Sequence, residues 1–259
     1  MTVSGIRTRL GRLVNGLLRP LGIGVHRRAF VERARRATYA GGLEHLKRLG
    51  FAPRTVVDVG VADGTMPLYQ TFPDARHVLI EPLEESKPFL EAIAGCFPHV
   101  EYVIAAAGRQ SGRVLINVHP DMARSSVYWE SDYVPGAVSP RDVPSITLDQ
   151  VKRERGLDGP ILLKIDVQGA ELDVLAGGEE TLPATECVVL EASLFEFFRG
   201  APLVSEVVAY MQRQGFVIYD VLALQYRPLD GAMSMIDLAF VKEHGSFRRA
   251  HRFHAAASG

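Results

Sequence analysis

A glycine-containing turn is the first stretch of the chain whose residue types and spacing could bind a polar ligand. In "VVDVGVADGT" an apolar, strand-like run leads into Asp58-x-Gly60-x-x-x-Gly64. A strand that feeds such a turn and then a helix offers backbone N–H groups to an anion or to the polar edge of a nucleotide. The dinucleotide fingerprint would place further glycines at positions 62 and 65, where this chain has Ala62 and Thr65. The spacing therefore counts against NAD, although a turn with two glycines can also be purely architectural.

An acidic residue at the end of the next apolar run strengthens the ligand-binding interpretation. Glu81 follows Gly60 by 21 residues, an interval at which a carboxylate can accept two hydrogen bonds from a ribose diol. The alternative is a solvated acid at a strand end. With the glycine turn before it, the ribose role is favoured.

The turn resembles the first motif of class I methyltransferases, which bind S-adenosylmethionine. Under this resemblance Glu81 faces the ribose, while Asp58 and Asp63 fix the turn or approach the methionine end of the ligand. S-adenosyl-L-methionine is therefore the expected cofactor, and no metal is assigned because no His-rich cluster supports one. The expected cofactor-binding residues are Asp58, Gly60, Ala62, Asp63, Gly64, Glu81, Pro82 and Ala106.

Further segments resemble one group of class I enzymes, the FkbM family of methyltransferases. They are "VVDVGVADG", "IEPLEES", "AAAG", "SITLD", "LLKIDVQGAELDVLAGG" and "VVLEAS", and the similarity spans about residues 54–242. The longest of these is the specific one. The family commonly has Glu where this chain has Gln168, which puts any role that needs a charge there in doubt. The resemblance implies O-methylation of a hydroxyl on a sugar, glycolipid, polysaccharide or secondary metabolite.

Three residues are candidates for catalysis. Methyl transfer from a sulfonium requires alignment of the acceptor and removal of its proton. Asp166, at the end of a predicted strand, is the first candidate for the base or for an acceptor-orienting carboxylate. Glu191 could orient the acceptor or bind a cation, and His119 is placed by sequence for acid–base work, against the simpler interpretation of a satisfied loop residue. Glu171 is expected to cap and brace its turn near a helix N-terminus.

The elements that must position these residues alternate between short apolar runs and helical segments, which is typical of a parallel sheet covered by helices. We expect a three-layer α/β/α, Rossmann-like class I methyltransferase fold, with a mostly parallel seven-stranded sheet whose last strand is antiparallel. "FVIYDVLAL" and "MIDLAFV" should form the closing hairpin. Strands are predicted near residues 55–60, 77–81, 100–105, 113–118, 161–166, 186–191, 216–224 and 236–242, and helices near 29–49, 65–72, 84–95, 147–155, 170–177 and 203–214.

A long segment from Asp121 to Pro144 has no clear period, and loops of that length inside a domain are usually functional or disordered. Its aromatic and hydroxyl residues could cover an acceptor or anchor the loop to the domain's own core. They are Ser125, Ser126, Tyr128, Trp129 and Tyr133.

The N-terminal region concentrates positive charge. Nine arginines and one acid, Glu32, lie between Ile6 and Arg36, and leucines recur there at helical spacing. This segment could pack on the domain or on a second subunit, or lie on an anionic membrane surface. We expect a basic amphipathic extension at 1–49, a methyltransferase domain at 50–245 and a flexible tail at 246–259.

Composition narrows the functional classes. A net charge of −1 over 259 residues gives no sign of a nucleic-acid binder. Two cysteines without ligand spacing favour a reducing, cytoplasmic setting, at the inner membrane surface if the basic segment binds lipid. The expected partner is a hydroxylated small-molecule, glycan or glycolipid acceptor, and homo-oligomer formation stays open. The alternative function is a non-catalytic binding or assembly protein on the same fold.

Overall fold

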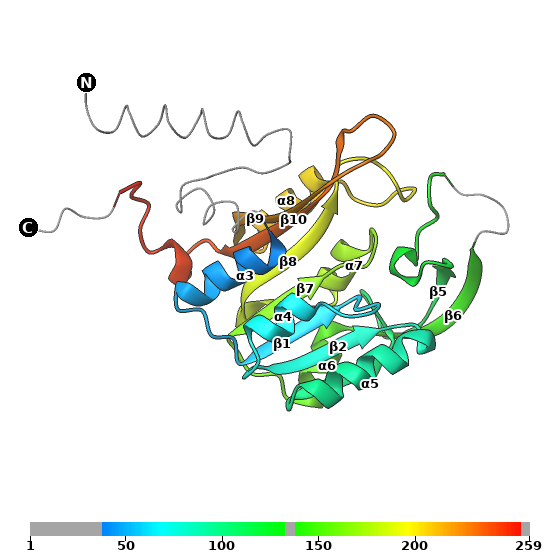
Figure 1. Ribbon diagram of the computed structural model, residues 1–259, viewed down its shortest axis with the longest axis horizontal. Helices are drawn as coiled ribbons and strands as arrows, with labels where there is room; N and C mark the ends of the chain where they lie inside the picture. The colour runs from blue at the N-terminus through cyan, green and yellow to red at the C-terminus, as the bar shows by residue number, and fades with distance from the viewer. Residues whose placement is uncertain (1–37, 133–137, 255–259) are drawn as a thin grey trace, which may run out of the picture.

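A seven-stranded sheet forms the centre of the computed structural model, which describes residues 38–132 and 138–254. The strand order is β3-β2-β1-β7-β8-β10-β9, and β10 alone runs antiparallel to its neighbours (Figure 1). The predicted fold class and the antiparallel last strand are confirmed. The strands are β1 (Thr55–Val59), β2 (Arg76–Glu81), β3 (Val100–Ile104), β7 (Ile161–Ile165), β8 (Thr185–Ser193), β9 (Phe216–Tyr226) and β10 (Met233–Lys242).

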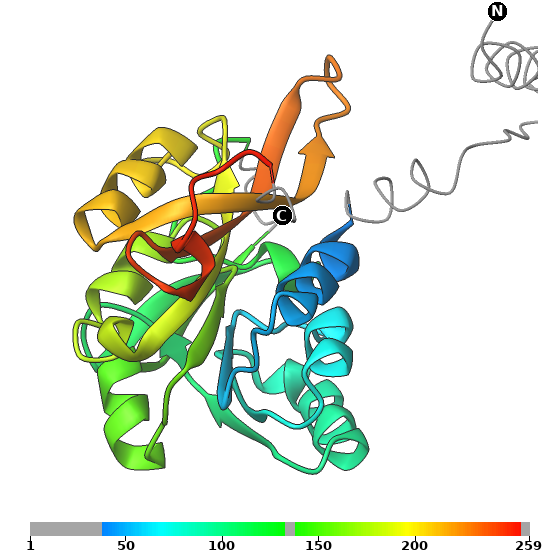
Figure 2. The same ribbon diagram turned by 90° about the vertical axis from the view of Figure 1, so that its left-hand side faces the viewer.

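Helices cover both faces of this sheet, so the domain has three layers (Figure 2). Both helical layers bury apolar side chains against the strands, and β1 and β7 are buried at every position, as central parallel strands require. One layer consists of α3 (Tyr39–Arg48), α4 (Met66–Thr71) and α5 (Lys87–Cys96), and the other of α6 (Leu148–Arg155), α7 (Glu171–Ala176) and α8 (Val204–Arg213). Short 3-10 turns lie at η2 (Glu84–Ser86), η3 (Met122–Arg124), η4 (Leu182–Ala184) and η5 (Ser246–Arg248).

The first described helix and the η5 turn near the last described residues both pack on the domain. Leu43 and Leu46 of α3 are fully buried, so this part of the predicted N-terminal extension shares the domain core. In η5 the ring of Phe247 lies 5.4 Å from that of Phe51 and 5.3 Å from that of Tyr219. The basic segment before residue 38 lies outside the described residues. Among the described helices, none has the length and apolar character to cross a membrane.

A second, smaller sheet stands beside the carboxyl ends of the central strands. It contains β4 (Ala106–Ala107), β5 (Gly112–Val118) and β6 (Ser139–Ile146) in the order β4-β6-β5. The strand predicted at 113–118 therefore exists, but it pairs with β6 rather than in the main sheet. Part of the segment from Asp121 to Pro144, which we expected to be a loop, is β6. Sequence analysis missed this strand because most of its residues are polar or proline. Only one of its faces is buried, where Val143 packs with Leu83, Ala106 and Ile116 in a small core.

The turn after β1 approaches β7 so closely that its glycine has no room for a side chain. Gly60 has a φ of +75°, and a Cβ at this position would lie 1.8 Å from the carbonyl oxygen of Asp166. The obstacle is backbone, which cannot rotate away.

We therefore expect Gly60→Ala to lower the free energy of unfolding by at least about 2 kcal/mol, measured by urea denaturation. Gly95→Ala is the matched control. A Cβ there would meet nothing within 4 Å, and alanine should leave a helical position unchanged or up to about 1 kcal/mol more stable. Equal stability of Gly60→Ala and the wild type would contradict the close approach.

Candidate functional site

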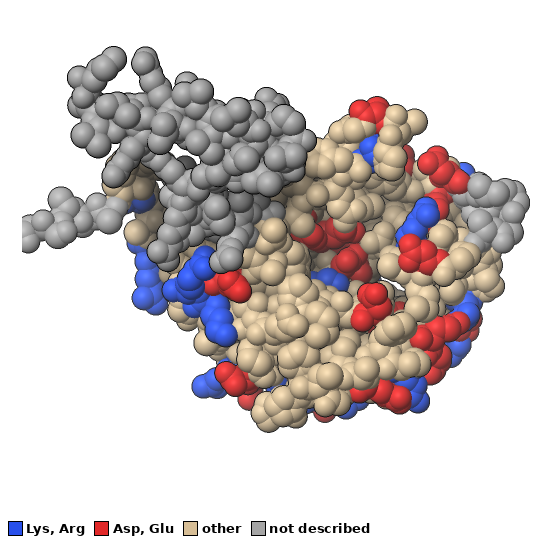
Figure 3. All heavy atoms as spheres, viewed as in Figure 1, with Lys and Arg blue, Asp and Glu red and all other residues tan. Residues whose placement is uncertain are grey.

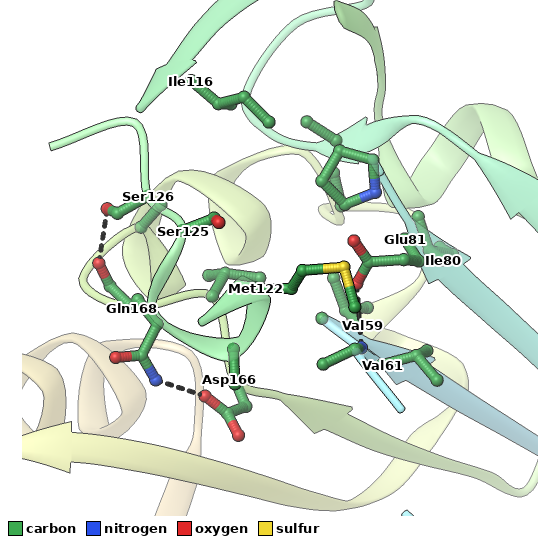
Figure 4. A pocket seen from close by; sticks show the side chains of 18 of the residues that line it. Val59, Val61, Ile80, Glu81, Ile116, Met122, Ser125, Ser126, Asp166 and Gln168 are labelled. Carbon is green, nitrogen blue, oxygen red and sulfur yellow. Dashed lines mark hydrogen bonds between the residues drawn. The ribbon is translucent and has the colours of Figure 1, made fainter. Parts of the chain in front are cut away.

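A cavity of about 210 Å³ lies at the carboxyl ends of β1, β2 and β7. The turn after β1 forms one wall, and the ends of β2 and β7 form two more. The fourth wall consists of β4, β5 and the loop that connects β5 to β6. Acidic side chains gather around a hollow on this face of the molecule (Figure 3). Figure 4 shows Met122 extending across the cavity toward Glu81. A parallel sheet commonly binds its ligands at this edge.

The structure brings seven of the eight predicted cofactor residues to this cavity. The seven that line it are Gly60, Ala62, Asp63, Gly64, Glu81, Pro82 and Ala106. Asp58 does not line it, because its side chain is fully buried beneath the turn. The expectation that Asp58 could approach the ligand is corrected in that respect, and its contacts are those that fix the turn.

Asp58 fixes the turn through a buried lysine. The Nζ atom of Lys164 lies 3.1 Å from Asp58 Oδ1 and donates a hydrogen bond of 2.9 Å to the carbonyl oxygen of Gly60. The Tyr69 hydroxyl donates to Asp58 Oδ2 at 2.5 Å. Burial alone would lower the pKa of the Lys164 ammonium, but Asp58 and then Asp166 raise it above its ordinary value. Lys164 therefore stays charged and joins the ends of β1 and β7.

Glu81 is held by the same turn. Its Oε2 accepts a hydrogen bond of 2.9 Å from the backbone N–H of Ala62, and its Oε1 accepts one of 3.0 Å from Leu83. Ala62 reaches this position with a φ of +49°, a conformation that few non-glycine residues adopt. Burial raises the pKa of Glu81, while the two N–H donors lower it. Each carboxylate oxygen keeps a lone pair for a further donor in the cavity.

The segment after β7 holds a second acid at the opposite wall. The backbone N–H of Asp166 donates to Val59 at 3.0 Å. The Gln168 amide donates to Asp166 Oδ1 and to Glu191 Oε2, each at 2.9 Å. Gln168 has a φ of +54°. Its backbone carbonyl oxygen accepts a hydrogen bond of 2.7 Å from the Ser126 hydroxyl. A glutamate at position 168 would bring a third carboxylate to these acids, whereas the amide supplies donors.

Glu171 braces this segment, as expected. Its Oε1 accepts hydrogen bonds from Gly169 at 3.0 Å and from Val167 at 3.3 Å. Burial raises the pKa of Glu171 to about 7. The carboxylate does not line the cavity.

Asp237 is an acid beside the site that sequence reasoning missed. It lies on β10 opposite Glu191 of β8. Burial and the nearby Asp166 raise the pKa of Asp237 to about 7, and burial with Asp166 and Asp237 raises that of Glu191 to about 9. A lone acid within the apolar run "MIDLAFV" was the available signal. Three carboxyl groups thus share one region beside the cavity.

The loop between β5 and β6 contributes its serines to the cavity wall but not its described aromatic residues. Ser125 and Ser126 line the cavity, whereas Tyr128 and Trp129 do not. His119 is also absent from the cavity wall, since its Nδ1 accepts a hydrogen bond of 2.9 Å from the backbone of Asp121. The contact that the structure gives His119 is therefore one within its own loop.

A second cavity, of about 480 Å³, adjoins the first. Asp166 and Gln168 line both. Glu191 lines the second cavity but not the first. In the two described stretches of chain, no group of three or more His, Cys, Asp or Glu residues has an arrangement that could hold a metal ion.

Comparisons with known proteins give a family and several relatives. The model of the methyltransferase FkbM domain matches residues 58–218. The 2-O-methyltransferase NoeI of Sinorhizobium fredii (strain NBRC 101917 / NGR234) is 44% identical over 61 residues, which are 24% of this chain and 25% of that protein. The match thus spans about a quarter of the curated relative's length.

Solved structures with a similar chain path include two methyltransferases. Magnesium protoporphyrin IX methyltransferase (ChlM) from Synechocystis PCC 6803, with bound SAM, has 12% identity and a TM-score of 0.46, over 91% of this chain and 96% of that chain. A putative RNA methyltransferase, PH1948 from Pyrococcus horikoshii, has 13% identity and a TM-score of 0.43, over 78% of this chain and 82% of that chain.

The raised pKa of Asp237 has a measurable consequence for stability. The unfolded chain releases this proton near pH 4, and the folded protein releases it near pH 7. Between these values the folded state binds more protons than the unfolded state, so stability falls as the pH rises.

We expect Asp237→Asn to flatten this loss between about pH 4 and pH 7, measured as the unfolding midpoint across a pH series. Asp74→Asn, which changes an exposed carboxylate at the other end of the strands, is the control and should retain the wild-type slope. Identical slopes for Asp237→Asn and the wild type would show that Asp237 titrates normally.

Proposed function

The chain belongs to the FkbM family of methyltransferases, and from this premise we propose that it transfers the methyl group of S-adenosylmethionine to a hydroxyl oxygen of a sugar, glycolipid or secondary metabolite. The observation that carries the proposal is the joint presence of the glycine turn, Glu81 and Asp166 on the walls of one cavity. These residues supply a nucleoside-binding wall and a proton acceptor at opposite sides of the same space.

The donor half of the proposal rests on the turn and on Glu81. S-adenosylmethionine supplies a methyl group that is activated by the positive charge of its sulfonium. Glu81 has lone pairs left for the two hydroxyls of a ribose, since its backbone donors occupy one position on each oxygen. Val61, Ile80 and Ile116 provide apolar surface for an adenine ring (Figure 4). The turn from Gly60 to Thr65 contributes backbone groups to the same wall.

Asp166 is the residue that we assign to the acceptor proton. As the acceptor oxygen gains the methyl group, its O–H bond breaks, its proton passes to Asp166 and the donor sulfur is left neutral. Lys164 Nζ lies 3.7 Å from Asp166 Oδ2 and contacts this side of the carboxylate. The Gln168 amide fixes the orientation of the other oxygen. Oxygen rather than nitrogen is supported by the partial match to a 2-O-methyltransferase.

Glu191 has a supporting place in this proposal. Its two oxygens accept hydrogen bonds from Gln168 and Gln225, so it joins the segment after β7 to β9. We assign Glu191 to orienting the acceptor. A non-catalytic binding protein is not favoured, because it would leave the acids between the two cavities without a chemical role.

Donor binding is tested by calorimetry with S-adenosylhomocysteine and the full-length protein. We expect wild-type binding, and a dissociation constant roughly 10- to 100-fold higher for Glu81→Gln, because two charge-assisted hydrogen bonds to the ribose weaken. Glu91→Gln on the exposed face of α5 is the control. Absence of binding to the wild type would contradict the donor assignment, and binding of NAD instead would restore the nicotinamide alternative.

The role of Asp166 is tested by methyl transfer. A screen of hydroxylated acceptors with a methyl-labelled donor should identify an acceptor, and Asp166→Asn should then lower transfer about 10²- to 10⁴-fold by removing the base. Affinity for S-adenosylhomocysteine should stay near the wild-type value.

Asp173→Asn, which changes a carboxylate on α7 that pairs with Arg109, is the matched control and should retain activity. Transfer by Asp166→Asn at the wild-type rate would exclude this carboxylate as the base.

A further inference from the structure

The second cavity has the position of an acceptor site. It adjoins the proposed donor cavity, and Ala123, Asp166 and Gln168 lie on the walls of both. A molecule in the second cavity would therefore reach Asp166 from the side opposite the glycine turn. No residue of the turn or of Glu81–Pro82 lines it, so the two cavities are chemically different.

The walls of this cavity are tied together by backbone hydrogen bonds. The N–H of Ser131 donates to Phe197 at 2.7 Å, and the N–H of Arg199 donates to Trp129 at 2.8 Å. The loop after β5 is thereby joined to the loop after β8. The Gln225 side chain, from the β9 end of the hairpin, donates to Glu191 at 2.7 Å. The cavity is thus a built site and not a gap between unconnected loops.

The charges on these walls are unequal. Four acidic residues line the cavity, namely Glu130, Asp132, Asp166 and Glu191, and Glu191, with its pKa raised to about 9, is uncharged at neutral pH. The cationic residues on the described walls are Arg124 and Arg227, and each is already paired.

The two arginines are poorly placed to receive an anion. Arg124 Nη2 lies 2.9 Å from Glu130 Oε2. Arg227 donates to both oxygens of Asp230, at 2.8 and 2.6 Å, and its guanidinium lies 3.8 Å from the centre of the Phe195 ring. Among the described wall residues, an incoming phosphate or carboxylate would meet acids without an uncommitted cation.

The remaining wall residues suit a ring that carries hydroxyl groups. Phe197, Phe198 and Tyr226 offer apolar faces, and the amides and carboxylates between them offer donors and acceptors. Resting on the proposed function, we propose that this cavity binds the methyl acceptor and that the part of the acceptor held there is an uncharged or amine-bearing sugar ring, not a phosphorylated or carboxylated one. Asp132 and Tyr226 are its specificity-determining residues.

Saturation-transfer NMR on the full-length protein, with S-adenosylhomocysteine bound, tests this proposal. The probes are matched sets of a hexose, its 2-amino derivative and its 6-phosphate, in the gluco, galacto and manno series. We expect binding of at least one neutral or amino sugar and at least about tenfold weaker binding of the matching 6-phosphate, because like charges oppose it. Tyr226→Ala, at an exposed strand end, should remove the neutral-sugar signal.

Charge reversal at Asp132 provides the second arm. Asp132→Lys should raise the affinity for the 6-phosphate at least about tenfold. Asp74→Lys, which changes an exposed residue at the opposite end of the strands, should not raise it. Equal binding of the 6-phosphate and the neutral sugar by the wild type would overturn the proposal. An equal effect of the two lysine variants would do so as well.

Failure of this proposal can be distinguished from failure of the proposed function. If S-adenosylhomocysteine binds but no sugar of the three series does, the acceptor proposal is overturned and the donor assignment stands. If S-adenosylhomocysteine does not bind, the proposed function itself fails.

Discussion

A buried lysine between two central strands is the interaction on which the site depends. Lys164 contacts the carboxylate of Asp58 and the carbonyl oxygen of Gly60, and it lies near Asp166. It therefore joins the turn that forms one wall of the donor cavity to the carboxylate that we assign as the base. Removing one partner of such a buried pair typically costs about 3–5 kcal/mol, because the other charge is left without compensation. The pair thus sets both the shape of the turn and the position of Asp166.

The site concentrates unfavourable features that the rest of the fold must stabilise. Asp166, Glu191 and Asp237 place three carboxyl groups in a partly buried region, and the pKa values of Glu191 and Asp237 are raised as a result. Ala62 and Gln168 adopt left-handed backbone conformations, which are costly for residues with a side chain. Strained backbone and shifted carboxyl groups often gather at functional sites. In this protein Asp166, Gln168 and Glu191 lie where the two cavities adjoin, and Ala62 lies on the wall of the first.

Much of this arrangement could be predicted from sequence, because it depends on local spacing. The periodic spacing of apolar residues predicted the central strands and their helices. The spacing of Gly60 and Glu81 predicted that both residues line one cavity, as they do. The features that sequence missed depend on contacts between distant segments. Asp58 is directed away from the cavity by Lys164, 106 residues later. Asp237 joins the acids through strand pairing with β8, and β6 is stabilised by its pairing with β5 rather than by its own composition.

The central claim is that the turn at Gly60 and the carboxylate of Glu81 form the wall of an adenosyl-binding cavity. A crystal structure of the protein with S-adenosylhomocysteine tests it most directly. The account predicts the nucleoside beside the turn, with both ribose hydroxyls within hydrogen-bonding distance of Glu81 and the sulfur directed toward Asp166. A nucleoside bound elsewhere, or a cavity closed by its own side chains at saturating ligand, would contradict it.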